Sequence, residues 1–268
     1  MWQRTYGMVS TSEPLPKVVS DKLEQVYETK VEQKKVILDL EEHQLFYSLE
    51  EGKMNKAPLL IGVLDATCYD IDCNGIEELI VLMLANEKDF EGRHEAYGNA
   101  LSIYDLSLAG NELQLHLRYT NEIGSQHPWM LAAGKLESRD AYGNLFVGVE
   151  KSTRFYQDVI NRPFFFTWQG LFIERKWTGS YLSRNEYVDL CFVDFDGDGY
   201  DEVAALERRE DGTYQVSLYK WLSFGFQHLI TSKETYKDAE MIACERVAKG
   251  SKTIIWVKEK DRCKIAQF

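Results

Sequence analysis

Residues 193–206 read V-D-F-D-G-D-G-Y-D-E-V-A-A-L, and this stretch decides the interpretation of the whole chain. Carboxylates stand at alternating positions, Asp194, Asp196 and Asp198, and Glu202 follows. So many negative charges in so few residues repel one another unless a cation screens them. Alternating oxygen ligands, a glycine at the sixth position and a later acid are how a short loop wraps Ca²⁺. The stretch therefore predicts a Ca²⁺-binding loop.

The flanks of this loop differ from those of an EF-hand. An EF-hand needs a glutamate at loop position 12, where this chain has Ala205. Residues 190–193 and 203–206 are short apolar runs typical of buried strands, with no amphipathic helix on either side. The loop is therefore expected to join two strands.

The same pattern occurs a second time. Residues 69–82 read Y-D-I-D-C-N-G-I-E-E-L-I-V-L and align with residues 193–206 without a gap, at an offset of 194 − 70 = 124. A single acidic stretch of this kind is also compatible with a solvated turn. Two copies between apolar strands favour metal binding.

These stretches resemble the Ca²⁺ loops of FG-GAP/VCBS-type repeats, which form the blades of integrin-α-like β-propellers. The family pattern is D-x-[DN]-x-[DN]-G-x-x-[DE] between two apolar strands, and both copies fit it. Neither copy shows the Phe-Gly and Gly-Ala-Pro signatures, so the resemblance is to the broader class. It implies that side chains at loop positions 1, 3, 5 and 9 and the carbonyl at position 7 bind one or two Ca²⁺ ions. The implied ligands are Asp194, Asp196, Asp198, Tyr200 and Glu202 in the second loop, and Asp70, Asp72, Asn74, Ile76 and Glu78 in the first.

A blade-like rhythm extends through most of the chain. Strand starts fall near residues 60, 131, 188 and 241, at spacings of about 71, 57 and 53, the period of four-stranded propeller blades. We predict an all-β, β-propeller-like array of four-stranded antiparallel blades with a short N-terminal helix. The blade-like units are expected near 58–120, 130–177, 187–230 and 239–268.

The N-terminal part is expected to differ from the blades. Residues 1–35 predict a linker and a helix over about 18–34, and residues 36–268 predict the propeller-like domain. The strand pair at 36–49 has two interpretations. It completes the last blade, or the chain is an open segment of a longer propeller.

The other two units are not expected to bind metal. An offset of 57 places Glu137, Arg139, Ala141 and Asn144 where the second loop has Asp194, Asp196, Asp198 and Asp201. Arg139 then stands at a ligand position. The turn of the last unit, residues 249–252, reads K-G-S-K. Within the two acidic loops, we expect the second to bind more tightly because it offers four carboxylates and the first offers three.

Composition limits the partners and the compartment. The net charge of −12 argues against nucleic acid and anionic membranes as partners. No stretch approaches 18 consecutive apolar residues, so no membrane insertion is expected in this chain. Residues 1–6 lack the apolar core of a signal peptide. The family resemblance nevertheless favours an extracellular or cell-surface protein.

The five cysteines form an odd count, too sparse for a disulfide scaffold. Cys191 and Cys244 lie in apolar strand stretches and are interpreted as small buried hydrophobic residues. A bridge between Cys68 and Cys73, which flank the first loop, is an alternative arrangement.

No catalytic residues are predicted. The sequence contains no H-E-x-x-H, G-x-S-x-G, P-loop or Rossmann fingerprint. The favoured function is a calcium-binding module for binding, adhesion or scaffolding, with a protein or carbohydrate ligand. Two alternatives stay open. One is a secreted hydrolase or carbohydrate-active enzyme with structural Ca²⁺ loops, and the other is a purely structural domain of a larger surface protein.

Overall fold

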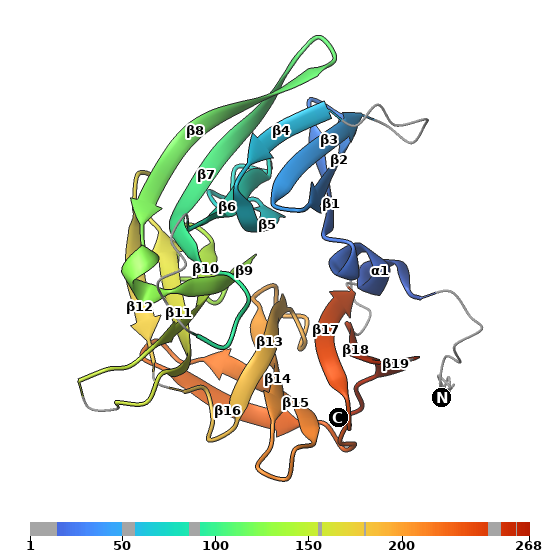
Figure 1. Ribbon diagram of the computed structural model, residues 1–268, viewed down its shortest axis with the longest axis vertical. Coiled ribbons are helices and arrows are strands. Elements are labelled where there is room, and N and C mark those ends of the chain that lie inside the picture. Colours follow the sequence, from blue (N-terminus) through green and yellow to red (C-terminus); the bar gives the residue numbers. More distant parts are fainter. Residues whose placement is uncertain are drawn as a thin grey trace. The chain divides into compact units, whose positions relative to one another are not determined.

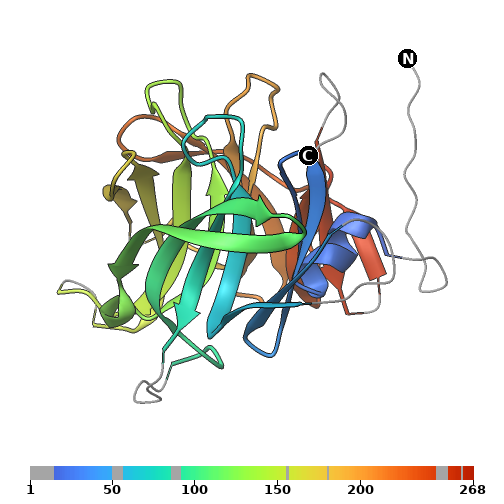
Figure 2. The same ribbon diagram turned by 90° about the horizontal axis from the view of Figure 1, so that it is seen from above.

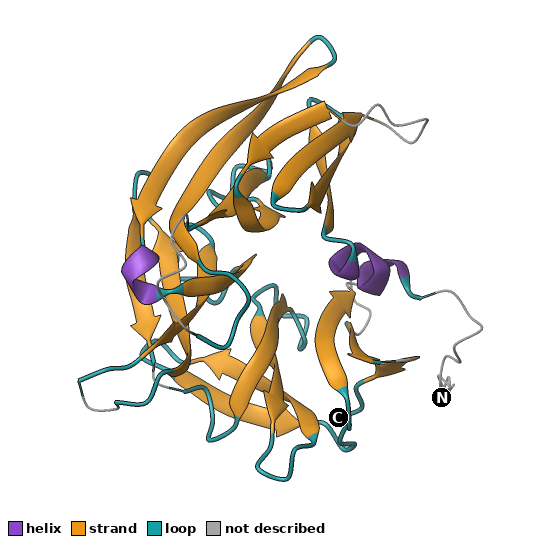
Figure 3. Ribbon diagram, viewed as in Figure 1, coloured by secondary structure: helices purple, strands orange, loops and turns teal. Residues whose placement is uncertain are grey.

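The computed structural model describes residues 15–49, 57–85, 92–154, 157–179, 181–245, 253–260 and 262–268. Within them almost all regular structure is strand (Figure 3). The predicted linker at residues 1–14 and the turn at 249–252 lie outside this part of the chain. None of the described helices is long and apolar enough to cross a membrane.

The chain divides into two compact units. Glu24–Ser180 form the contiguous unit, and Met1–Leu23 with Tyr181–Phe268 form the split unit. The contiguous unit contains the short 3₁₀ helix η1 (Gly124–Gln126) and the strands β1 (Val26–Val31), β2 (Lys34–Glu41), β3 (Gln44–Leu49), β4 (Ala57–Ile61), β5 (Val63–Tyr69), β6 (Glu78–Leu84), β7 (Gly98–Ala109), β8 (Glu112–Glu122), β9 (Pro128–Gly134), β10 (Asn144–Lys151), β11 (Ile160–Trp168) and β12 (Ile173–Thr178). The split unit contains α1 (Lys17–Leu23), β13 (Glu186–Val193), β14 (Glu202–Arg208), β15 (Tyr214–Trp221), β16 (Phe226–Thr231), β17 (Ala239–Glu245), β18 (Ile254–Glu259) and β19 (Arg262–Ile265).

Each sheet is an antiparallel meander in which strands that follow one another in the chain lie side by side (Figure 1 and Figure 2). The contiguous unit has three such sheets, β1–β4, β5–β8 and β9–β12, and the split unit has β13–β16 and the three-stranded β17–β19 among its described residues. This is the blade topology of β-propellers. The predicted class, an all-β, β-propeller-like array of antiparallel blades with a short N-terminal helix, is confirmed.

The N-terminal helix is much shorter than predicted. It ends at Leu23, and residues expected to continue it form β1, which pairs with β2 along its whole length. From Tyr27 on, the sequence V-Y-E-T-K-V alternates uncharged and charged residues, and Thr29 and Val31 are buried. An alternation with period two places one face of a strand in the core. Reading those apolar residues at helical spacing was therefore wrong.

The strand pair at 36–49 does not complete the last blade. β2 and β3 lie between β1 and β4 in a sheet of their own. The predicted strand start near residue 60 is in fact a boundary between two sheets. Gly62, with φ of +79°, separates β4 from β5. Only glycine adopts this backbone conformation at little cost, so the chain can leave one sheet and enter the next here.

An aspartate on the first strand of a sheet ties neighbouring sheets together within each unit; Asp189 is buried and Asp65 half-buried. In β5 and β13 the strand register shifts at matching places, just before Asp65 and just before Asp189. Asp65 accepts a hydrogen bond from the backbone N–H of Leu131 on β9, at 2.7 Å. Asp189 accepts one from Ile242 on β17, at 2.8 Å. The spacing 189 − 65 = 124 equals the loop offset, so the repeat extends beyond the acidic loops.

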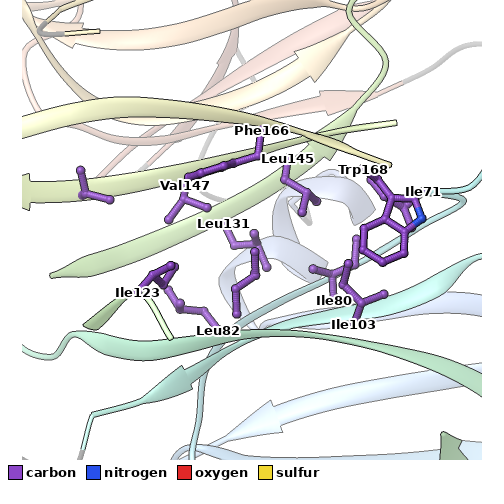
Figure 4. Packing of buried hydrophobic residues seen from close by; sticks show 12 residues of the cluster. Ile71, Ile80, Leu82, Ile103, Ile123, Leu131, Leu145, Val147, Phe166 and Trp168 are labelled. Carbon is purple, nitrogen blue, oxygen red and sulfur yellow. The ribbon is translucent and has the colours of Figure 1, made fainter. Parts of the chain in front are cut away.

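The core of the contiguous unit anchors the first acidic loop. Ile71, the second residue of that loop, is fully buried among side chains of β5–β8 and β9–β12, including Ile80, Leu145 and Trp168 (Figure 4). Burying an aliphatic side chain contributes roughly 1.5–3 kcal/mol. In the split unit the equivalent residue, Phe195, contacts the ring of Phe268 with centroids 5.3 Å apart. Both loops are thus fixed by their second residue.

Two cysteines were misassigned. Cys191 on β13 and Cys244 on β17 form a disulfide across two sheets of the split unit, 53 residues apart in sequence. The interpretation of these residues as free hydrophobic side chains was wrong, because the sequence does not reveal that their strands are neighbours. Cys68 and Cys73 are free, so the alternative bridge at the first loop does not form.

Candidate metal centres

The first acid of each loop folds the backbone back on itself. The Asp70 carboxylate accepts hydrogen bonds from the N–H groups four and five positions later, at 2.9 and 2.8 Å. The Asp194 carboxylate accepts them from three and five positions later, at 2.9 and 3.1 Å. The residue at the sixth position, Gly75 or Gly199, has φ of +91° or +89°. The glycine is required there because other residues are strained at such angles.

The last acid of each loop is buried at the start of the following strand. Glu78 and Glu202 are 2% and 1% exposed. Each uses one carboxylate oxygen to accept the N–H of the second loop residue: Ile71 donates at 2.9 Å and Phe195 at 3.0 Å. The two loops therefore share the bond from the sixth-position glycine to the first acid and the bond from the second residue to the last acid.

Three carboxylates converge in each loop. One oxygen from each of Asp70, Asp72 and Glu78 lies within 4.8 Å of the others, and the same holds for Asp194, Asp196 and Glu202. Ca²⁺ binds oxygen ligands at about 2.3–2.6 Å, so oxygens on opposite sides of one ion are nearly 5 Å apart. Both sets of side chains therefore fit a shared hard cation.

The side chain at the fifth loop position bonds within its own loop. Asp198 lies outside the cluster of its loop, and its carboxylate accepts the N–H of Tyr200 at 2.9 Å. Asn74 makes the equivalent bond to the N–H of Ile76 at 2.7 Å. It stays a prediction that metal binds through Asp198 and Asn74, or through the carbonyls of Tyr200 and Ile76.

A basic side chain from another strand contacts each cluster. Arg118 on β8 places Nη1 2.8 Å from Asp72 and 3.4 Å from Glu78, and its Nε 3.1 Å from Asp105 on β7. These charges come from later strands of the same sheet. Sequence spacing does not predict these contacts, because strand register brings the charged residues to the loop.

The second loop receives its basic side chain from Lys220 on β15. The ammonium nitrogen lies 2.6 Å from Asp196, 3.0 Å from Asp198 and 2.9 Å from Glu202. The contact with Glu202 is ionic only, because its geometry does not satisfy a hydrogen bond and that carboxylate oxygen has no hydrogen-bond donor. The buried oxygen thus has a cation beside it in the metal-free protein.

When the charges of neighbouring strands are counted, the reason to expect tighter Ca²⁺ binding by the second loop disappears. Lys220 follows Tyr219, which pairs with Val203, and Asp105 follows Tyr104, which pairs with Leu79. The two side chains therefore occupy equivalent positions, with a cation at one and an acid at the other. Together with the loop residues, each site has four carboxylates and one basic group. The number of carboxylates no longer favours the second loop.

Burial and neighbouring charges shift two carboxylate pKa values in opposite directions. Burial, with the adjacent Asp72 charge, raises the pKa of Glu78 to about 7, although the Ile71 N–H and Arg118 oppose the shift. For Asp198, burial would raise the pKa, but the bond from Lys220 outweighs it and lowers the pKa. The first cluster therefore takes up protons near neutral pH.

In the loop between β9 and β10, a lysine from β12 contacts two acids, and no set of three carboxylates converges among the described residues. Lys176 on β12 lies 2.6 Å from Glu137 and 2.7 Å from Asp140. Asn144 accepts the N–H of Leu136 at 2.8 Å, the bond that Glu202 makes in the second loop. The bond spans eight residues here and seven there, so Asn144 corresponds to Glu202 and not to Asp201, as the fixed offset had placed it.

A second polar cluster in the contiguous unit is built around Glu150. This buried carboxylate accepts bonds from the Arg93 N–H at 3.0 Å, Arg93 Nε at 2.8 Å and the Tyr97 hydroxyl. Burial would raise the pKa of Glu150, but these bonds lower it, and the pKa of Tyr97 rises to about 12. Nearby, His94 bonds Asn161 at 2.9 Å. Sequence spacing does not predict this cluster, since Glu150 and Asn161 lie more than 50 residues from Arg93 and His94.

Comparison with known proteins adds no relative. No family model matches the chain, and no curated protein matches it. The loops' own geometry therefore carries the functional argument.

Proposed function

We propose that this protein is a Ca²⁺-binding, β-propeller-like repeat domain of FG-GAP/VCBS type that serves as a binding, adhesion or scaffold module, with its metal ions structural. The geometry that the two acidic loops share carries this proposal. Two loops that repeat the same turn, the same buried glutamate and the same convergence of three carboxylates favour one shared ligand. That ligand is a hard cation, since every converging atom is oxygen.

In this proposal the acidic residues of each loop have different structural roles. Asp70 and Asp194 shape the turn, while Glu78 and Glu202 fix the second residue from the following strand. Asp72 and Asp196 complete each cluster. A bound Ca²⁺ supplies positive charge that offsets the mutual repulsion of these carboxylates. The loop then holds the first two strands of its blade in register.

Two further observations support an extracellular binding module. The Cys191–Cys244 disulfide favours an oxidising compartment. A cavity of about 550 Å³ lies beside the first loop and is lined by Glu28, Thr29, Lys30, Lys35, Gly75 and Glu77. The buried Thr29 hydroxyl has no hydrogen-bond partner in the described structure. A polar lining with both charge signs suits a hydroxyl-rich ligand, so a carbohydrate is the favoured class here.

Calcium titration tests the proposal. Calorimetric titration of wild type should show two Ca²⁺-binding events. Asp72→Ala should lose the event of the first loop, and Asp196→Ala should lose the event of the second. Ca²⁺ at 100 times its Kd should stabilise the fold by about 2.7 kcal/mol per site, which raises Tm by a few degrees. Asp211→Ala, in an exposed turn outside both loops, is the control. Wild-type melting curves that coincide in chelator and in millimolar Ca²⁺ would refute the proposal.

The cluster around Glu150 favours a second candidate, a hydrolase whose acidic loops are structural. A buried carboxylate beside tyrosine, arginine and histidine side chains is an arrangement that active sites use. In this structure both Glu150 oxygens accept bonds from Arg93, so the first candidate is preferred. Hydrolysis of chromogenic glycosides by wild type, abolished in Glu150→Gln with unchanged Tm, would reverse that preference.

A further inference from the structure

Three sheets share a bulge that bears on the acidic loops. The last strand of each sheet has one unpaired residue at the same register: Arg118 in β8, Lys176 in β12 and Leu229 in β16. Arg118 and Lys176 each extend from this bulge to the acids of the loop in their own sheet. In the split unit the bulge residue is apolar, and Lys220 on the preceding strand provides the cation. Each of the three loops thus receives one basic side chain from its own sheet.

The loop between β9 and β10 shows what such a side chain does alone. Lys176, 8% exposed, lies between Glu137 and Asp140. Asn144 replaces the buried glutamate of the other two loops, and this loop brings no third acid close. A lysine ammonium from a later strand of the same sheet therefore contacts the acids of a blade loop whose described residues bring no three carboxylates together.

The second loop combines both arrangements. It has the converging acids Asp194, Asp196 and Glu202, and Lys220 contacts two of them. Two cations cannot occupy contact distance of the same oxygens without strong mutual repulsion. The Lys220 side chain is 30% exposed, and its flexible four-carbon stem gives the ammonium group a path to solvent.

We propose that Lys220 is a tethered counter-ion of the second loop, which holds the loop closed in the metal-free protein and must leave the carboxylates when Ca²⁺ binds. Ca²⁺ affinity at this loop is then set by competition with a lysine of the same chain. The competition rests on the proposed function, whereas the counter-ion role in the metal-free protein does not. Lys220 is a positioning residue in this scheme and not a metal ligand.

The first loop lacks this arrangement and serves as an internal reference. Asp105 occupies the position equivalent to Lys220, and Arg118 contacts Asp105 as well as the loop acids. Arg118 therefore has a carboxylate partner outside the loop, which Lys220 does not have among the contacts that the structure describes. A change at Lys220 should affect one of the two binding events only.

The test uses three variants of the full chain. Lys220→Met keeps most of the aliphatic stem and removes the charge, whereas Lys220→Arg keeps the charge. Lys237→Met makes the same change in net charge at an exposed lysine. Unfolding is measured in chelator, and Ca²⁺ binding is measured by calorimetry. Both are repeated in an Asp70→Asn background that weakens the first loop.

In chelator, Lys220→Met should melt several degrees below wild type because Asp196, Asp198 and Glu202 lose their counter-ion. Its second-loop Ca²⁺ affinity should nevertheless rise roughly tenfold, the effect of one repelling charge close to the site. Its Ca²⁺-induced Tm shift should rise accordingly. Lys220→Arg should restore the chelator stability, and Lys237→Met should match wild type in both measurements.

Unchanged stability of Lys220→Met in chelator would overturn the counter-ion role. Equal or weaker Ca²⁺ binding by Lys220→Met, with wild type binding normally, would overturn the competition while leaving the proposed function intact. If neither protein takes up Ca²⁺, the proposed function is wrong and the competition falls with it. The chelator melts still decide the counter-ion role in that case.

Discussion

The carboxylate of Asp189 on β13 accepts a hydrogen bond from the backbone N–H of Ile242 on β17, 2.8 Å away. The same oxygen lies 2.6 Å from the ammonium group of Lys22 on α1, which also donates to the Ile242 carbonyl. One buried carboxylate thus joins the first strands of two sheets and the N-terminal helix. Asp65 and Leu131 repeat the strand contact in the contiguous unit.

We expect Asp189→Ala to lower the free energy of unfolding of the split unit by about 1–3 kcal/mol, since it leaves a buried N–H without a partner. Urea unfolding followed by fluorescence measures this change. Asp211→Ala, at an exposed turn, should cost much less. An Asp189→Ala variant as stable as Asp211→Ala would show that the carboxylate does not hold the sheets together.

The raised pKa of Glu78 predicts an unusual pH dependence. Folded Glu78 has a pKa of about 7 and its ordinary value is 4.5, so the folded state binds the proton more tightly. Its contribution to stability is complete below about pH 4.5 and is lost as pH rises through 7. In chelator, Glu78→Gln should therefore gain stability relative to wild type between pH 5 and 8, by on the order of 2 kcal/mol.

Thermal melts at intervals across that pH range compare the two proteins. Saturating Ca²⁺ should reduce the difference, because metal and proton compete for the same carboxylate. Parallel stability curves for wild type and Glu78→Gln in chelator would contradict the pKa shift.

The hydrogen bonds of Glu207 on β14 predict that removal of one hydroxyl donor, that of Tyr219, lowers stability. This buried carboxylate accepts bonds from Ser183, Gln215 and Ser217 at 2.8–3.0 Å, and from the Tyr219 hydroxyl. Bonds to charged groups contribute about 1.5–3 kcal/mol. Tyr219→Phe should therefore lower the free energy of unfolding by that amount in urea titrations.

Tyr214→Phe is the matched control for that variant. It lies on the same strand, and the described structure gives its hydroxyl no hydrogen bond. Equal stabilities of the two variants would mean that the Tyr219 hydroxyl contributes nothing to the Glu207 network.

Removing the disulfide should destabilise the split unit. Cys191–Cys244 closes a loop of 53 residues. Closing a loop of this length lowers the entropy of the unfolded chain and so raises the free energy of unfolding by about 4 kcal/mol. Calorimetry of the Cys191→Ala, Cys244→Ala double variant should show this loss. Reductant should lower the Tm of wild type and leave the Tm of the double variant unchanged. A reductant effect of similar size on both proteins would assign it to another site.

The acidic loops and the blade class could be predicted because they depend on residues that are close together in the sequence. Asp194 and Glu202 are close in the chain, and alternation with glycine constrains a loop whatever surrounds it. Asp65 and Asp189 could also have been found, since the offset of 124 continues to them. Nothing local marks Lys220 or Arg118 as loop partners, because strand pairing brings them there.

Boundaries were harder to predict than motifs. The helix was extended into β1 because apolar residues there fit helical and strand spacing alike, and pairing with β2 decides between them. The boundary between two sheets at Gly62 was missed because apolar residues continue on both sides of it. The pairing of Cys191 with Cys244 depends on which strands become neighbours, which is a property of the tertiary fold.

The disulfide also determines how the split unit would respond to mechanical force. Tension applied to the two ends of the chain passes directly from Cys191 to Cys244 through the sulfur atoms. The intervening segment, about 180 Å when fully extended, therefore bears no load while the bond is intact. That segment includes the second acidic loop and Lys220. Pulling on the oxidised protein leaves this part of the blade unstretched, and reduction of the bond exposes it to the full force.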